Sequence, residues 1–212
     1  MTRAEQIWTV VVGGGSGQRF GTLKQYEPLG PQRVIDHAVE AADASSDGVV
    51  VVVPADDAAR EGAIAGGATR SDSVRAGLAA VPDDATIICV HDAARPFATP
   101  ELFARVVAAV ADGADGAIPA VAVTDTIKVV EAGVVVATPD RTTLVAVQTP
   151  QAFRAHVLRE AHATGGASTD DAALVEAVGG RVVVVDGDTR NRKITHPDDL
   201  DWARRQLESS RS

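Results

Sequence analysis

The chain has 212 residues, of which 45% are hydrophobic and only 3% aromatic, and its formal net charge is −9. This length predicts one domain over residues 1–212, with a core of Val, Ala, Leu and Ile. The negative charge argues against binding to nucleic acid or to an anionic membrane surface. No apolar run reaches the roughly 18 residues of a membrane span. The N-terminal segment MTRAEQIW carries an acid, so we expect no signal peptide and a cytoplasmic location.

Apolar β-branched segments alternate with helical patterns along the chain. The sequence predicts strands at 7–12, 48–54, 86–90, 116–123 and 181–187, and helices at 33–44, 71–81 and 99–112. Thr99 is the expected N-cap of the last helix, with Pro100 at its first position. Continuous apolar runs are typical of strands that are covered on both faces. We therefore predict an α/β fold with a mostly parallel sheet between two layers of helices.

Segment 123–151 departs from this alternation. Two short β-rich pieces surround the tripeptide Glu131-Ala132-Gly133, which is typical of a hairpin. The sequence leaves two interpretations open. The hairpin either lies at an edge of the sheet or forms an arm that reaches another subunit.

Polar groups follow three of the predicted strands. A glycine-rich loop, GGGSGQR, follows the first strand, the segment HDAARPF follows the third, and NRK lies after the last. Ligands of open α/β sheets bind at the carboxyl ends of the strands. The three segments are therefore expected to meet at one site.

The glycine-rich loop matches neither of two familiar phosphate-binding templates. A P-loop requires a Gly-Lys pair, which the chain lacks, and the G-x-G-x-x-G pattern fails at Gln18 and Phe20. Glycines still let a backbone approach a phosphate closely, and Arg19 and Lys24 add positive charge nearby. A plain glycine turn is the alternative interpretation.

The segment HDAARPF places an acid and an arginine three residues apart. Asp92 is able to hold Mg²⁺ or to orient a polar group. Arg95 either contacts an anion or pairs with Asp92. The chain has only three lysines, Lys24, Lys128 and Lys193, and a lysine ammonium acts on phosphate as a compact point charge.

Seven segments together carry a family resemblance. They are GGGSGQRF…LKQY, GGATRSDSVRAGL, VHDAARPF, TDTIK, DRTTLVAVQTPQAF, STDDAAL and NRKITHPDDL. In this order, and over nearly the whole chain, the sequence resembles the 2-C-methyl-D-erythritol 4-phosphate cytidylyltransferases. The related ribitol 5-phosphate cytidylyltransferases more often have Val where Ala94 stands. Ala94 therefore mildly favours the methylerythritol enzymes.

The resemblance implies a reaction and a fold. CTP and 2-C-methyl-D-erythritol 4-phosphate would give the cytidine diphosphate sugar alcohol and pyrophosphate, with Mg²⁺. The implied fold is a Rossmann-like nucleotidyltransferase three-layer sandwich, with an inserted β-arm at about 123–148 that interlocks a homodimer. The nucleophile would be a phosphate monoester with a second pKa of about 6, so no general base is needed.

The resemblance also assigns roles to individual residues. Arg19, Lys24 and Lys193 match the catalytic cations at the triphosphate. Gly13, Gly14, Gly15, Gly67 and Ser73 match the nucleotide-binding positions. Asp92 and Arg95 match positions beside the sugar phosphate, Asp92 also being the candidate metal ligand, and Thr126 and Arg141 match arm residues that bind the acceptor across the dimer. Asp170 and Asp171 are interpreted as helix-capping acids, and His162 as an ordinary helix residue.

The sequence departs from the family pattern in three places. Gly13-Gly14-Gly15 replaces Ala-Ala-Gly, Leu23 replaces a proline on a shortened stretch after Arg19, and Ala68 stands where some members carry an acid. Three alternatives stay open: an NAD(P)-dependent oxidoreductase, a non-catalytic relative, and a nucleotidyltransferase for another sugar phosphate.

Overall fold

A computed structural model describes residues 5–14, 23–166 and 168–209. Its centre is an eight-stranded sheet in the order β10-β7-β11-β6-β1-β4-β5, with β12 paired to β7. These strands are β1 (Ile7–Val12), β4 (Gly48–Val53), β5 (Ile64–Ala65), β6 (Ile87–Asp92), β7 (Gly116–Ala122), β10 (Val145–Val147), β11 (Gln151–Arg154) and β12 (Val182–Asp186).

The sheet is mostly parallel, as predicted. β1 pairs in parallel with both β4 and β6, β4 pairs with β5, and β12 pairs with β7. The exceptions are β11, which runs antiparallel between β6 and β7, and β10, which runs antiparallel to β7. The sequence did not predict these two strands, because β11 is short and contains Gln and Arg, and β10 has only three residues.

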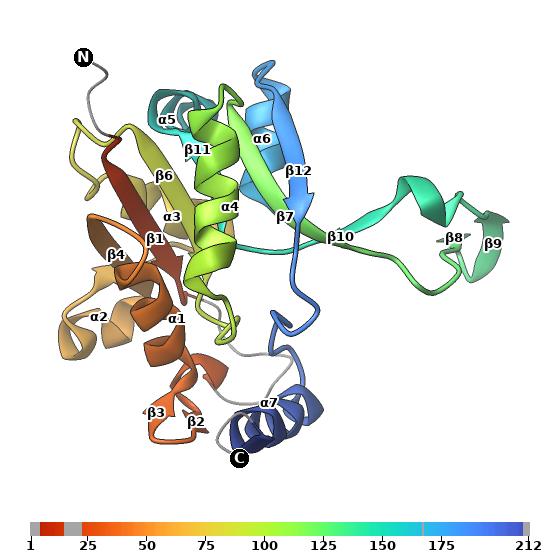
Figure 1. Cartoon of the computed structure of the whole chain (residues 1–212), viewed down its shortest axis with the longest axis horizontal. Coiled ribbons are helices and arrows are strands. Elements are labelled where there is room, and N and C mark those ends of the chain that lie inside the picture. The colour runs from red at the N-terminus through yellow and green to blue at the C-terminus, as the bar shows by residue number, and fades with distance from the viewer. Residues whose placement is uncertain (1–4, 15–22, 167, 210–212) are drawn as a thin grey trace.

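Helices cover both faces of the sheet and form the predicted three-layer sandwich (Figure 1). Their bounds are α1 (Val34–Asp43), α2 (Ala55–Glu61), α3 (Arg70–Leu78), α4 (Pro100–Ala111), α5 (Ala155–Ala163), α6 (Asp171–Ala177) and α7 (Pro197–Ser209). Successive residues of a strand point to opposite faces of the sheet and pack against different helices. Val10 packs with α3, α5 and α6, whereas Val11 packs with α1 and α4. The sheet is thus apolar on both faces, which explains the continuous valine runs.

Local chemistry fixes where the helices begin. The Thr99 side chain accepts a hydrogen bond from the Leu102 N–H, and Pro100 occupies the first turn of α4, as the sequence predicts. Thr69 caps α3 by accepting from the Asp72 N–H. Because α3 follows the loop after β5, this cap also fixes the direction in which that loop approaches the sheet edge.

The C-terminal helix α7 packs away from the sheet, against the small hairpin of β2 (Pro28–Leu29) and β3 (Gln32–Arg33). Leu29, Leu200 and Ile194 form a separate small core there. The Ile194 N–H donates to the Ala94 carbonyl over 2.8 Å. This bond ties the segment that carries Lys193 to the loop after β6.

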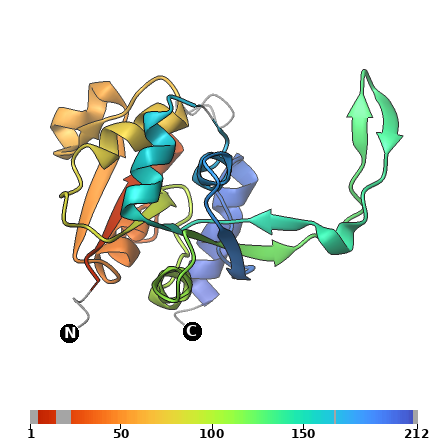
Figure 2. The same cartoon turned by 90° about the horizontal axis from the view of Figure 1, so that it is seen from above.

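The predicted hairpin is an arm and not part of the sheet edge. Among the strands of the described residues, β8 (Val129–Glu131) and β9 (Val134–Ala137) pair only with each other, around a turn at Ala132 and Gly133 with φ values of 47° and 82°. Figures 1 and 2 show this arm projecting from the body beyond β7 and β10. The sheet-edge interpretation is therefore wrong. That the arm contacts a second subunit stays a prediction.

Two further features agree with the sequence. Cys89 lies in β6 and is fully buried, and burial raises the pKa of its thiol to about 12. Within the described ranges, none of the helices has the length and apolar character needed to cross a bilayer.

Candidate active site

A cavity of about 440 Å³ lies at the carboxyl ends of β1 and β6. It is bounded by the glycine loop, the loop before α3, the end of β6 and the segment after β12. The residues around it are Val12, Gly13, Gly14, Lys24, Gln25, Gly67, Ala68, Thr69, Arg70, Ser73, Asp92, Ala93, Ala94 and Lys193. The glycine-rich loop, the segment HDAARPF and the segment NRK, which the sequence analysis places at one edge of the sheet, thus each contribute residues to this cavity.

The glycine loop leaves β1 close against its neighbours. The Gly13 N–H donates to the Val52 carbonyl over 2.7 Å, and a Cβ added at Gly14 would lie 2.9 Å from the Ser73 hydroxyl. Both glycines border the cavity. Gly15 and Arg19 lie outside the described residues, so their predicted roles stay predictions.

Ser73 shapes the opposite wall. Its hydroxyl donates to the Thr69 carbonyl over 3.0 Å and accepts from the Gly67 N–H over 3.2 Å. A Cβ at Gly67 would overlap the Asp72 Cβ, so only glycine fits this backbone. The Gly67 backbone is thus packed closely against Asp72 at the border of the cavity. The role of this loop in reading a nucleobase stays a prediction.

Asp92 is the electrostatic centre of the cavity. Its Oδ2 lies 2.6 Å from the Lys193 ammonium, and its Oδ1 lies 3.4 Å from the Arg70 Nε. Burial by itself would raise the pKa of Asp92, but the charges of Lys193 and Arg70 outweigh it and hold the pKa below its usual value. The carboxylate is therefore ionised at neutral pH and suited to accept hydrogen bonds. Its predicted role as a metal ligand stays a prediction.

Lys24 lies at the start of the short helix η1 (Lys24–Tyr26) and borders the same cavity as Lys193. The two lysines come from positions 169 residues apart in the chain (193 minus 24). A cavity with two ammonium groups beside one carboxylate suits a polyanion such as a triphosphate.

Arg95 is buried beside the cavity and does not border it. Its Nη1 donates to the Asn191 carbonyl over 2.7 Å, and its Nη2 donates to the Val147 carbonyl over 3.3 Å. The Arg95 N–H donates to the Asp92 carbonyl over 3.0 Å, but the alternative of an ion pair between the two side chains, both of which the structure describes, is not formed. Arg95 instead joins the loop after β6 to the segment that precedes Lys193.

Arg95 also borders a neighbouring cavity of about 390 Å³ at the base of the arm, together with Arg192, Lys193 and His196. Lys193 is common to both cavities. A direct contact between Arg95 and an acceptor stays a prediction.

His91 holds this loop in place through two contacts. Its Nε2 lies 3.3 Å from the Arg95 carbonyl, and its Nδ1 lies 3.1 Å from the Thr149 hydroxyl. The Thr149 hydroxyl also accepts from the Asp92 N–H over 3.0 Å. Burial lowers the pKa of His91 to about 4, so the imidazole is neutral at pH 7.

Thr126 and Arg141 are not brought to the cavity by their own chain. Both are exposed and lie within the inserted segment that carries the arm. Arg141 donates to the Thr124 carbonyl over 2.8 Å, and Thr126 lies outside β8. Their predicted role in a partner's site stays a prediction.

Sequence reasoning missed Arg70 and Gln25, which both border the cavity. Gln25 is 3% exposed, and its Nε2 has no hydrogen-bond partner among the described residues. Both residues lie inside the segments that carry the family resemblance. No local pattern of residue types marks either one as functional.

The interpretation of two adjacent acids also needs correction. Asp170 caps α6 by accepting from the Ala173 N–H over 3.2 Å, as expected. Asp171, in contrast, is fully buried and forms an ion pair with Arg70 over 2.8 Å and a 3.0 Å hydrogen bond with His162. Asp171 therefore belongs to the charge network of the cavity.

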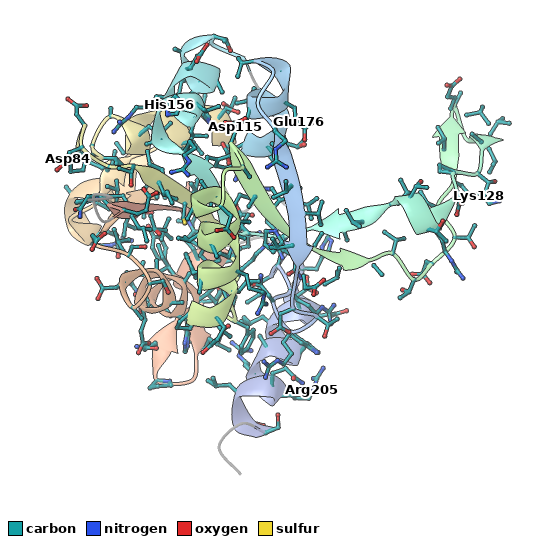
Figure 3. All side chains as sticks on the ribbon, turned by 45° about the horizontal axis from the view of Figure 1, so that its top comes forward. Asp84, Asp115, Lys128, His156, Glu176 and Arg205 are labelled. Atoms are coloured by element: carbon teal, nitrogen blue, oxygen red, sulfur yellow. The ribbon has the colours of Figure 1, made fainter. Side chains whose placement is uncertain are left out.

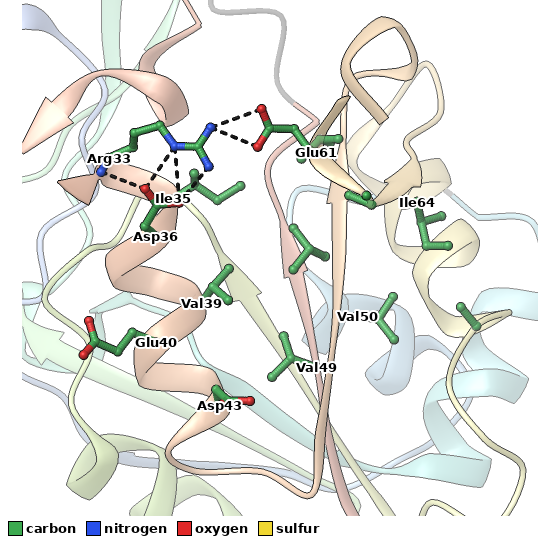
Figure 4. Close-up of a pocket in the computed structure, with 15 residues that line it drawn as sticks. Arg33, Ile35, Asp36, Val39, Glu40, Asp43, Val49, Val50, Glu61 and Ile64 are labelled. Atoms are coloured by element: carbon green, nitrogen blue, oxygen red, sulfur yellow. Dashed lines mark hydrogen bonds and ion pairs between the residues drawn. The ribbon is translucent and has the colours of Figure 1, made fainter. Parts of the chain in front are cut away.

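A second large cavity, of about 590 Å³, lies by β4 and β5 between α1 and α2 (Figure 4). Its main cation is already neutralised, because Arg33 binds Asp36 over 2.8 Å and Glu61 over 2.9 Å. The cavity lacks the sheet-edge loops and the cation–carboxylate arrangement found at Asp92. We therefore assign the chemistry to the cavity at Asp92.

Comparison with known proteins places this geometry in a family. The family model "IspD: 2-C-methyl-D-erythritol 4-phosphate cytidylyltransferase" matches residues 7–209. A relative named 2-C-methyl-D-erythritol 4-phosphate cytidylyltransferase, from Geobacter metallireducens, is 41% identical over 92% of this chain and 94% of its own length.

Other relatives are longer. A bifunctional enzyme IspD/IspF from Anaeromyxobacter dehalogenans is 46% identical over 99% of this chain, which spans 59% of that protein. The chain thus covers about three-fifths of the length of such relatives.

A solved structure supports the same family. The crystal structure of the 2-C-methyl-D-erythritol 4-phosphate cytidylyltransferase from Thermus thermophilus superposes with a TM-score of 0.80 at 34% identity, covering 94% of this chain and 98% of that one. The match argues against the oxidoreductase alternative. The chain belongs to the 2-C-methyl-D-erythritol 4-phosphate cytidylyltransferase family.

Proposed function

We propose that this chain transfers the cytidylyl group of CTP to 2-C-methyl-D-erythritol 4-phosphate and releases pyrophosphate. The observation that carries the proposal is the meeting of Lys24, Lys193 and Asp92 at one cavity on the carboxyl edge of β1 and β6. Family membership supplies the substrates.

The reaction needs alignment and charge more than proton transfer. An oxygen of the acceptor's phosphate attacks the α-phosphorus of CTP, and the bond from that phosphorus to the bridging oxygen of pyrophosphate breaks. The electron pair leaves with pyrophosphate. Because the attacking phosphate is already largely a dianion at neutral pH, no side chain has to remove a proton. Asp92, which stays ionised, and His91, which stays neutral, are consistent with this.

The two lysines have complementary tasks. Negative charge accumulates around the α-phosphorus and on the leaving pyrophosphate, and cations that contact these groups stabilise such charge strongly. We assign Lys193 to the α-phosphate, because it borders both cavities, and Lys24 to the rest of the triphosphate. Arg19 is expected to assist Lys24.

Mg²⁺ is the expected cofactor. The described residues contain no cluster of three or more His, Cys, Asp or Glu side chains able to hold a metal by themselves. Mg²⁺ is commonly held by one or two carboxylates together with substrate phosphates, and Asp92 fits the role of the single protein carboxylate. The ion would neutralise phosphate charge.

The acceptor site is proposed to form between two subunits. Thr126 and Arg141 are exposed on the arm, and Arg141 is suited to a bidentate contact with a phosphate. The arm valines are also exposed, with Val130 at 54% and Val134 at 64%. A homodimer in which each arm reaches the partner's cavity would cover these valines and supply both residues.

The remaining expectations concern location and other partners. We propose that the enzyme acts in the cytoplasm and binds neither nucleic acid nor membranes. The net charge of −9 supports this, since it disfavours both polyanionic surfaces.

Pyrophosphate release tests the proposal. The protein would be assayed with CTP and Mg²⁺ and with methylerythritol phosphate, ribitol 5-phosphate or no acceptor. Release with methylerythritol phosphate alone is the expected result. Release with ribitol 5-phosphate alone would retain the reaction class and overturn the substrate. A folded protein that releases pyrophosphate with neither acceptor would overturn the proposed function.

A further inference from the structure

A line of charged and polar side chains, buried at its inner end, leads from the cavity into the helical layer behind it. Lys193 contacts Asp92, Asp92 contacts Arg70, Arg70 contacts Asp171, and Asp171 contacts His162. The Asp171 side chain is 1% exposed and that of His162 is 3% exposed. The line therefore joins the start of α3 to α5 and α6 beneath the cavity.

Helix capping does not explain this arrangement. Asp170 already caps α6, so Asp171 is not needed for that purpose. A buried carboxylate costs free energy unless it is paired and hydrogen-bonded. Asp171 meets this requirement with Arg70 on one oxygen and His162 on the other. The paired arginine is the one that borders the cavity.

The two cations on Asp92 are held differently. The Lys193 side chain is 39% exposed, sits on a flexible stem and has Asp92 as its ion-pair partner. Arg70 is 22% exposed and is anchored by a shorter contact to Asp171, at 2.8 Å, than the one to Asp92, at 3.4 Å. A triphosphate carries several negative charges and competes with one carboxylate for the ammonium. Lys193 is therefore free to turn toward phosphate, whereas Arg70 is fixed.

We propose that Asp171, oriented by His162, is a positioning residue that holds Arg70 as the permanent counter-ion of Asp92 during turnover. When Lys193 engages the substrate, Arg70 keeps the buried Asp92 carboxylate paired and correctly oriented. The anchor also keeps Arg70 from closing fully onto Asp92, which leaves the carboxylate available to the reacting groups. This inference rests on the proposed cytidylyl transfer and deepens it.

The chain offers a matched pair of variants. Asp171→Asn removes the anchoring charge without changing the size of the side chain, and Asp170→Asn makes the same change one residue away, where asparagine still caps the helix. We expect Asp171→Asn to lower kcat at least about tenfold while the KM for CTP changes less than about threefold, because the loss appears after binding. Asp170→Asn should keep kcat within about twofold of the unsubstituted protein.

Folding must be separated from positioning. The concentration of CTP-binding sites in each variant, measured by equilibrium dialysis, gives the folded fraction, and kcat is expressed per binding site. A loss of kcat that disappears after this correction would show a merely structural role and overturn the inference. An Asp171→Asn protein with unchanged kcat per site would overturn it as well.

Chemical rescue supplies a second readout. Arg70→Ala should lose turnover, and added guanidinium, well below the concentrations that unfold proteins, should restore part of it. Sodium chloride at equal ionic strength should not. Equal effects of the two salts would contradict the assigned role of Arg70. The unsubstituted protein runs in the same assay, so its failure to release pyrophosphate would reject the proposed function separately.

Discussion

Asp92 is a carboxylate with a 10% exposed side chain that faces two cations from distant parts of the chain. The negative charge of Asp92 holds the Lys193 ammonium at one position in the cavity, because an ammonium without an ion-pair partner would have no preferred position. The sequence shows that Asp92 and Lys193 are an acid and a cation and that each follows a predicted strand. The depth of Asp92 and the second cation, Arg70, are visible only in the structure.

Replacing Lys193 tests the residue that the account places nearest the reacting phosphorus. Lys193→Ala should lower kcat by about 10²- to 10³-fold, as expected when one preorganised electrostatic group is lost. Steady-state kinetics with CTP and methylerythritol phosphate would measure the effect.

Arg205→Ala is the matched control for this change. Arg205 is an exposed cation on α7 (Figure 3), in the same C-terminal region. Its replacement should leave kcat unchanged. A Lys193→Ala protein that turns over at close to the normal rate would remove Lys193 from the mechanism.

At the scale of elements, α3 approaches the sheet unusually closely at Gly77. A Cβ at this position would overlap Val10 and lie 3.0 Å from the Val52 side chain. The helix needs this closeness because its N-terminal turn must bring Arg70 and Ser73 to the cavity edge. Packing of one helix therefore controls two walls of the site.

Gly77→Ala sets two opposing effects against each other. Alanine favours a helix over glycine by up to about 1 kcal/mol, whereas overpacking of a core typically costs about 1–3 kcal/mol. Because the added methyl meets branched side chains on the buried face of the sheet, we expect overpacking to prevail and the free energy of unfolding to fall. Urea denaturation would measure it. A more stable Gly77→Ala protein would show that α3 shifts without strain.

The arm is the element whose function depends on another molecule. Val130→Asp combined with Val135→Asp places charge on the exposed apolar arm. This double variant should be monomeric in sedimentation experiments and lose turnover, while CTP binding persists, because the CTP cavity lies in the body. Val184→Asp is a suitable control, since Val184 is also exposed, at 56%, but lies on β12. An arm variant that remains dimeric and active would reject the proposed interface.

For the whole molecule, periodicity predicted the sandwich and the sheet edge that bears the site. Strands such as β1 and β4 are read from uninterrupted valine runs, and the rule that ligands bind at strand ends then brings Gly13, Asp92 and Lys193 together. Non-local pairing was not predictable. β11 lies between β6 and β7 and runs antiparallel to both. No local sequence pattern indicates which strands β11 pairs with.

The same limit applies to the charge network. Asp171 looks like a second capping acid in sequence, because Asp170 precedes it at a helix start. Its partners lie 101 residues away, at Arg70, and 9 residues away, at His162. Such contacts depend on how α3, α5 and α6 pack together. Likewise, the projection of the arm depends on β8 and β9 pairing with each other and not with the sheet.

The proposed reaction requires nucleophilic attack by the acceptor phosphate at the α-phosphorus of CTP. Phosphorus-31 NMR of the complete reaction, with CTP, methylerythritol phosphate and Mg²⁺, identifies the phosphorus that is attacked. Equal amounts of pyrophosphate and of a cytidine diphosphate diester with two coupled phosphorus signals are expected. Formation of CDP with a newly phosphorylated acceptor would place the attack at the γ-phosphorus and contradict the proposed reaction. Formation of CMP and pyrophosphate without a diester would show transfer to water and contradict it as well.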